Sequence, residues 1–135
     1  MRVLICGDIV GKSGRNAIRR ELPNLKKLKQ IDFVLANGEN AANGFGITNK
    51  IWEEFYSLGV DVITSGNHIW DQKEIVEYIK LDNRLIRPCN FSEGTPGNGY
   101  AIFEMKNGEN IVVINVMCRL FMESVDDPFK SIANL

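Results

Sequence analysis

The chain has 135 residues, enough for one domain with a single hydrophobic core. Hydrophobic residues make up 44% and charged residues 24%, a composition that excludes disordered and fibrous classes. The net charge of −1 predicts no general nucleic-acid-binding surface. No apolar run reaches the roughly 20 residues of a membrane span, and no signal-peptide pattern opens the chain, so we expect a cytoplasmic protein.

The first half of the chain alternates short apolar runs with helical patterns. The runs predict strands at residues 3–6, 33–36 and 61–64. Apolar residues at helical spacing predict helices at residues 12–29, 47–58 and from 71 onward. We expect Pro23 to end or kink the first helix, and Asp71 with Glu74 to form a capping box for the third. This alternation indicates βαβ units, and therefore an α/β layered fold with a parallel sheet.

The pattern changes after Arg84. Prolines and glycines predict a long loop at residues 88–99. Two strand-like runs, residues 100–105 and 111–116, flank Asn107-Gly108, which is a strong signal for an antiparallel hairpin. Pro128 is placed to begin another helix. Because no repeat or biased linker interrupts the chain, we expect residues 1–135 to form a single domain.

Polar residues follow the end of each of the three predicted parallel strands. They stand in the motifs Gly7-Asp8, Gly38-Glu39-Asn40 and Gly66-Asn67-His68. The carboxyl ends of parallel strands meet at one edge of a sheet, so we expect the three loops to converge. Together they supply two carboxylates, two carboxamides and an imidazole, donors suited to divalent Mn, Fe or Zn.

Each motif alone has a structural explanation. An Asp after a strand, such as Asp8, commonly caps a helix or a turn, and Glu39-Asn40 could cap a loop. His68 is the only histidine, and a lone histidine is more often structural than catalytic. The coincidence of three such loops favours a metal site. A dinucleotide site is disfavoured because the glycine spacing does not give G-x-G-x-x-G and Asp8 would lie beside the pyrophosphate.

The three motifs resemble the opening motifs of calcineurin-like metallophosphoesterases. A longer set resembles the bacterial branch of YmdB-like phosphodiesterases and runs along nearly the whole chain. It comprises Gly7-Asp8-Ile9-Val10-Gly11, Asn37-Gly38-Glu39-Asn40-Ala41-Ala42, Gly66-Asn67-His68-Ile69-Trp70-Asp71, Arg87-Pro88, Glu93-Gly94-Thr95-Pro96-Gly97 and Asp126-Asp127-Pro128-Phe129.

The resemblance implies a role for each matching residue. It assigns Asp8 to a first metal ion, with Asn40 contributing near it, and Glu39 to a bridge between two ions. It assigns Asn67 to the second metal ion, and His68 to protonation of the leaving group. The implied cofactors are two divalent ions, Fe or Mn first and Zn as a further option. The implied reaction is hydrolysis of 2',3'-cyclic nucleotides or other phosphodiesters by a metal-activated water.

Three departures from the superfamily pattern qualify this expectation. Val10 stands where other superfamily members place a histidine, as it does in this branch, and Met117-Cys118-Arg119-Leu120 replaces an expected Gln-Gly-Arg-like turn. Family members also continue beyond this length and supply further histidine ligands from their second half. We therefore expect the amino-terminal half of a metallophosphoesterase domain, with a weak second metal site.

An incomplete fold has a further expected consequence. A truncated chain would expose a strand edge and apolar surface, so we predict a homo-oligomer. The alternative to an active phosphodiesterase is an inactive truncated homologue that binds metal weakly or acts through self-association.

Overall fold

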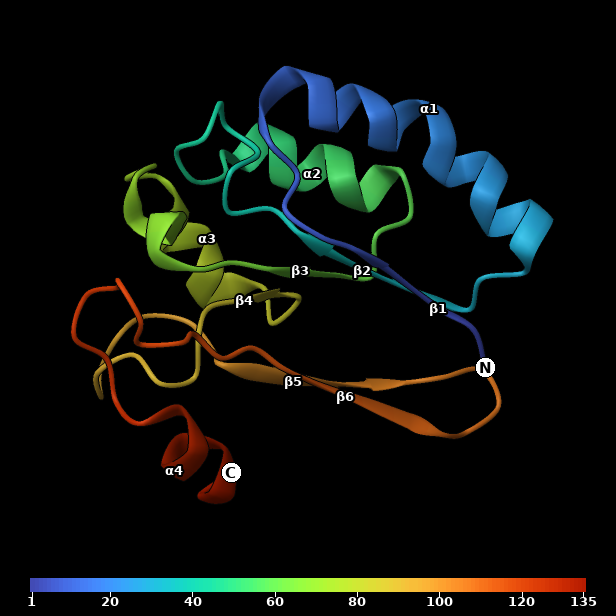
Figure 1. Ribbon diagram of the computed structural model, residues 1–135. Coiled ribbons are helices and arrows are strands. Elements are labelled where there is room, and N and C mark those ends of the chain that lie inside the picture. The colour runs from blue at the N-terminus through green and yellow to red at the C-terminus, as the bar shows by residue number, and fades with distance from the viewer.

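A four-stranded parallel sheet forms the centre of the molecule, as seen in the computed structural model, which describes residues 1–135 (Figure 1). Its strands lie side by side in chain order: β1 (Val3–Cys6), β2 (Phe33–Asn37), β3 (Val62–Thr64) and β4 (Leu85–Ile86). Because each crossover moves to the next strand in the same direction, the connecting helices lie on one face of the sheet. The predicted α/β layered fold with a parallel sheet is confirmed.

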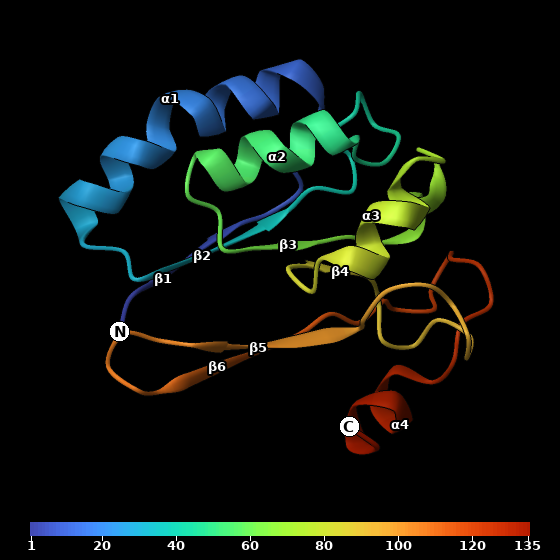
Figure 2. The ribbon, with the colours of Figure 1, turned by 180° about the vertical axis from the view of Figure 1, so that it is seen from behind.

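Helices α1 (Gly11–Lys29) and α2 (Asn49–Ser57) cover one face of this sheet (Figures 1 and 2). After β3 the chain forms a short 3-10 helix (Asn67–Trp70) and then α3 (Ile75–Leu81). The main core lies between these helices and the sheet. Its fully buried members include Val34, Ala36, Phe55, Ile63, Ile79 and Leu85.

An antiparallel hairpin covers the opposite face of the sheet. It consists of β5 (Tyr100–Glu104) and β6 (Asn110–Ile114), as the Asn107-Gly108 signal predicts. A second core fills the space between the two sheets, where the rings of Phe33 and Phe103 lie 5.2 Å apart. The chain ends in α4 (Pro128–Ala133), which both views place beyond the hairpin (Figures 1 and 2). None of the helices has the length and apolar content needed to cross a membrane.

Helix α1 does not end at Pro23, contrary to one of the two expectations for that residue. Leu22 is buried in the core, whereas Pro23 is exposed, so the proline ring faces away from the sheet. Beyond it, the Nζ of Lys26 donates a hydrogen bond to the carbonyl of Gly59 at 2.6 Å. Tertiary contacts on both sides of Pro23 thus offset the missing backbone hydrogen bond.

The predicted capping box at Asp71 and Glu74 is wrong, because α3 begins only at Ile75. The Asp71 carboxylate instead contacts His68, and the Oε1 of Glu74 accepts a hydrogen bond from the backbone N–H of Asn49 at 2.7 Å. Both carboxylates therefore link separate segments instead of capping their own helix.

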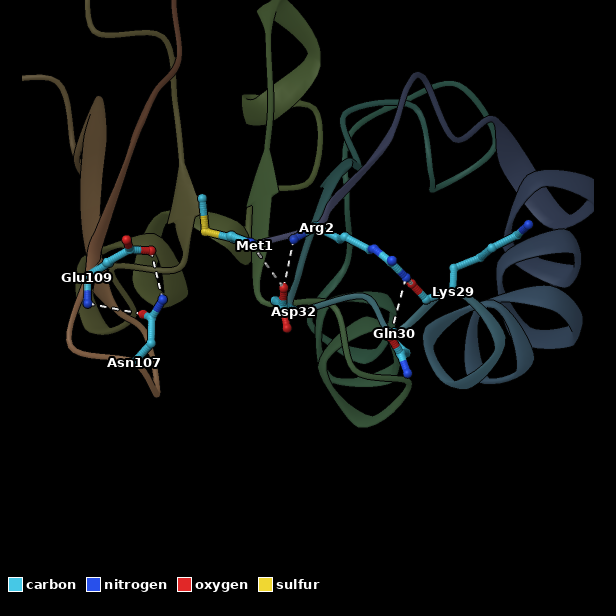
Figure 3. Close-up of polar contacts among 7 residues, drawn as sticks. All are labelled: Met1, Arg2, Lys29, Gln30, Asp32, Asn107 and Glu109. Carbon is cyan, nitrogen blue, oxygen red and sulfur yellow. Dashed lines mark hydrogen bonds and ion pairs between the residues drawn. The ribbon is translucent and has the colours of Figure 1, made fainter.

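The amino-terminal ends of the strands lie at the far end of the sheet from the candidate site. There the backbone N–H of Arg2 donates to the Oδ2 of Asp32 at 2.7 Å, and its guanidinium donates to the carbonyl of Lys29 (Figure 3). In the hairpin turn, the Nδ2 of Asn107 donates to the Oε2 of Glu109 at 2.7 Å (Figure 3). These contacts stabilise the start of β1 and the hairpin turn. The converging loops lie at the opposite end, where the parallel strands have their carboxyl ends.

Candidate active site

Three loops leave the carboxyl ends of β1, β2 and β3 and are joined by their backbones. The N–H of Ile9 donates to the carbonyl of Asn37 at 3.1 Å, and the N–H of Gly11 donates to that of Asn40 at 3.0 Å. The N–H of Gly38 donates to the carbonyl of Thr64 at 2.9 Å. The second loop is therefore bonded to the first loop and to the end of β3, as the convergence of the loops requires.

Asp8 and Asn40 come together at the first of these junctions. The Nδ2 of Asn40 donates a hydrogen bond to the Oδ1 of Asp8 at 2.6 Å, across 32 positions of sequence. Asp8 is exposed and Asn40 is half-buried. The pair presents carboxylate and carboxamide oxygens at the surface, next to the start of α1.

Glu39 lies at the second junction, directly against Gly66. A Cβ atom on Gly66 would stand only 2.0 Å from the Oε2 of Glu39, so the position admits no side chain. This Oε2 is buried and has no hydrogen-bond partner. The Oε1 atom has one long contact, 3.4 Å from the Nδ2 of Asn37. A buried carboxylate oxygen without a donor is costly, and a bound cation is one partner that removes this cost.

Asn67 and His68 begin the third loop as part of the 3-10 helix. Asn67 is exposed and lines a cleft of about 180 Å³ together with Trp70 and Phe91. The Nδ1 of His68 lies 2.7 Å from the Oδ2 of Asp71. With Nδ1 engaged by a carboxylate, Nε2 is the ring nitrogen left to meet a substrate.

The second loop also packs on the backbone of His68. Gly46 has a positive φ of 75°, and a Cβ there would approach the carbonyl oxygen of His68 to 2.8 Å. The Nε2 of Gln72 donates to the carbonyl of Phe45 at 2.6 Å, and the ring of Phe45 meets the imidazole of His68 edge-on. These contacts fix the position of His68 relative to the loop that carries Glu39.

Two asparagines that the sequence analysis missed hold the surrounding backbone. The Nδ2 of Asn115, just after β6, donates to the carbonyl of Ser65 at 2.7 Å. Asn90 is fully buried, and its side chain bonds both the N–H and the carbonyl of Met117 at 3.0 and 2.8 Å. In the sequence, each of these asparagines is only a polar residue near an apolar run. That pattern does not distinguish a buried side chain that binds two backbone segments from an exposed loop residue.

The donor chemistry fits part of a metal site. No group of three or more His, Cys, Asp and Glu side chains is close enough to hold a metal ion. The unpartnered oxygen of Glu39 and the Asp8–Asn40 pair nevertheless offer oxygen donors of the type that hard cations prefer. The assignment of Asp8, Glu39, Asn40 and Asn67 as ligands, and of His68 as the acid, stays a prediction.

The helix layer, the parallel sheet, the hairpin and the converging polar loops together define an α/β protein with the architecture of the phosphoesterase-like fold expected above. The chain belongs to the YmdB-like protein family, whose model matches residues 4–135. The resemblance found in the motifs is therefore confirmed.

Individual relatives give the same family relationship. The chain is 46% identical over 129 residues to a 2',3'-cyclic-nucleotide 2'-phosphodiesterase of Bacillus subtilis, covering 96% of this chain and 48% of that protein. It matches the crystal structure of a hypothetical protein from Thermus thermophilus with a TM-score of 0.92 and 38% identity, over 99% of this chain and 52% of that one.

A further solved structure, described as a novel phosphatase, comes from Mycoplasma pneumoniae. It matches with a TM-score of 0.90 and 32% identity, over 98% of this chain and 49% of that one. The chain thus spans about half the length of the relatives that it matches.

Proposed function

We propose that this chain forms one half of a metal-dependent phosphodiesterase site that acts on 2',3'-cyclic nucleotides. The observation that carries the proposal is the buried Oε2 of Glu39, which has no protein partner and lies where the second and third loops meet. The name of the Bacillus subtilis relative supports the substrate class.

Asp8 and Asn40 would hold a first divalent cation, Asn67 a second, and Glu39 would be shared between them. Fe and Mn suit this mixture of oxygen donors, and Zn is a further option. When bound, such cations supply an activated water as nucleophile and offset the charge that develops on the phosphoryl oxygens.

His68 would donate the proton that the leaving oxygen needs as its bond to phosphorus breaks. The carboxylate of Asp71, 2.7 Å from Nδ1, would orient the ring. Nε2–H would then be the donor to the leaving oxygen. The ring of Phe45 packs edge-on against the imidazole, and Gly46 packs against the backbone carbonyl of His68, so both contacts help to position the residue.

One observation favours the alternative of an inactive homologue that binds metal weakly or self-associates. The chain does not gather three His, Cys, Asp or Glu side chains at one point, so the site needs donors from outside these residues. Water would have to fill the remaining coordination positions.

Metal analysis combined with hydrolysis assays tests the proposal. The purified chain is analysed for bound Mn, Fe and Zn and assayed with Mn²⁺ on 2',3'-cyclic AMP and bis-p-nitrophenyl phosphate. We expect Asn67→Ala to lower the rate at least tenfold, and the exposed Asn83→Ala to leave it unchanged. His68→Ala should lose activity and retain metal. A chain that binds no metal would contradict the proposal, whereas a chain that binds metal but shows no Asn67-dependent hydrolysis would favour the inactive homologue.

A further inference from the structure

A cleft of about 180 Å³ lies next to the candidate active site, with Asn67 in its wall. Three segments that are distant in sequence form it: the 3-10 helix after β3, the loop after β4 and the segment after β6. Figures 1 and 2 both show these segments together at the carboxyl end of the parallel strands. The volume is below the roughly 300–1,000 Å³ of a site for a drug-sized ligand, so the cleft suits a single ring system.

Two aromatic side chains give this cleft flat apolar walls. Trp70 comes from the 3-10 helix and Phe91 from the loop after β4, and their ring centroids lie 6.5 Å apart at an interplanar angle of 43°. Both residues are half-buried and line the cleft. Partly exposed aromatic rings in a concave site favour a planar ligand, because nucleobases and similar rings stack on them.

The cleft also contains one carboxylate. Glu123 lies in the segment after β6, is exposed and forms no ion pair. A carboxylate accepts hydrogen bonds and donates none, so it recognises a ligand edge that carries N–H groups. Two adjacent N–H donors engage both of its oxygens at once, and such charge-assisted hydrogen bonds are stronger than neutral ones.

Hydrogen bonds hold the walls of the cleft in place without a ligand. The guanidinium of Arg87 donates to the carbonyl of Thr95 at 3.2 Å, which braces the loop after β4. The side chain of Asn90 bonds the backbone of Met117 and donates to the carbonyl of Asp126 at 3.0 Å, so both ends of the segment after β6 are fixed. Because the walls are preformed, a ligand does not have to order them on binding.

We propose that this cleft is the subsite for the base of the nucleotide substrate, and that Glu123 makes guanine the preferred base. Guanine carries N1–H and its 2-amino group side by side. Adenine offers one amino group next to an acceptor nitrogen, and uracil has carbonyl oxygens on both sides of its only N–H. The assignment rests on the proposed function, in which Asn67 holds the second cation. A cyclic phosphate bound there lies beside the cleft, and the ribose leads the base into it.

Nucleoside binding in EDTA tests the subsite without metal or hydrolysis. The chain is titrated with guanosine and with uridine, and the indole N–H signals of its two tryptophans are followed by NMR. We expect guanosine to bind at least tenfold more tightly than uridine and to shift the signal of Trp70, while that of Trp52 on α2 stays unchanged. Glu123→Gln should weaken guanosine binding at least tenfold and leave the uridine affinity unchanged. Glu93→Gln is the matched control, because Glu93 is exposed on the loop after β4 but does not line the cleft.

Three results would overturn the base subsite. They are guanosine binding no tighter than uridine binding, guanosine binding that leaves the Trp70 signal unchanged, and an equal loss of guanosine affinity in Glu93→Gln. The proposed function is measured separately, by bound metal and Asn67-dependent hydrolysis. Hydrolysis without guanosine preference contradicts the base subsite alone. Guanosine binding at Trp70 in a chain that binds no metal supports the base subsite and contradicts only the metal-dependent reaction.

Discussion

Gly66 shows how a single residue can determine the geometry of the candidate site. With a hydrogen in place of a side chain, it lets the carboxylate of Glu39 approach the third loop. Gly66→Ala should displace Glu39 and destabilise the fold by about 1–3 kcal/mol, the usual cost of overpacking. Urea unfolding measures this change. Gly7→Ala is the matched control, because a Cβ there meets no atom within 4 Å. Equal stability of the two variants would contradict the contact.

The three cysteines should differ in reactivity. Burial raises the pKa of the Cys6 and Cys89 thiols above the usual value, whereas Cys118 is exposed. A raised pKa leaves less of the reactive thiolate at a given pH. At pH 8, a chromogenic disulfide reagent should therefore label Cys118 fast, and Cys6 and Cys89 slowly.

The labelling rate of Cys118 should reach its maximum at a lower pH. The labelling rates of Cys6 and Cys89 should continue to rise as the pH is raised further. Cys118→Ser removes the fast phase and serves as the control. Labelling of all three thiols in one phase would argue against the burial of Cys6 and Cys89.

At the level of elements, the sequence predicted most of the helices and strands but few of the tertiary contacts between them. Apolar runs and the Asn107-Gly108 turn identify β1, β2, β3 and the hairpin, because burial and turn chemistry are local signals. The two-residue strand β4 carries too short a run to be recognised. Asp71 and Glu74 matched a capping box in sequence, yet each carboxylate contacts a different segment, which only the tertiary fold decides.

The same limit applies to the candidate site. The three glycine-led motifs could be found because parallel strands bring their carboxyl ends together. The contact of Glu39 with Gly66 and the clamp formed by Asn90 depend on segments far apart in the chain, and no spacing pattern encodes them. The metal ligands themselves stay a prediction, because no group of three or more His, Cys, Asp and Glu side chains is close enough to hold a metal ion.

Asn90 connects the long loop after β4 to the segment after β6. Its side chain bonds the backbone of Met117 and the carbonyl of Asp126. Asn90→Ala would leave buried backbone groups without partners, so we expect a loss of about 1–3 kcal/mol and faster hydrogen exchange at Met117. The exposed Asn83→Ala is the control and should change neither quantity. Unchanged exchange at Met117 would show that Asn90 is not a clamp.

At the scale of the whole molecule, two cores share one sheet. Side chains of β2, β3 and β4 alternate between the helix layer and the hairpin, so Val34 and Ile63 face one core while Phe33 and Val62 face the other. Neither core can form without the strands that both use. We therefore expect residues 1–135 to unfold in a single cooperative transition, as the predicted single domain requires.

One substitution in each core tests this coupling. Phe55→Ala removes a fully buried ring from the helix core and should cost about 3–5 kcal/mol. Val113→Ala removes two methyl groups from the hairpin core and should cost about 1–3 kcal/mol. For each variant, the unfolding curve followed by the fluorescence of Trp52 and Trp70 should coincide with the curve followed by backbone circular dichroism. Both curves should have a lower urea midpoint than those of the unsubstituted chain. Both tryptophans lie in the helix layer, so a Val113→Ala curve that leaves their midpoint unchanged would show that the hairpin unfolds separately. A common shift means that the shared sheet transmits a loss in the hairpin core to the layer that carries the candidate site.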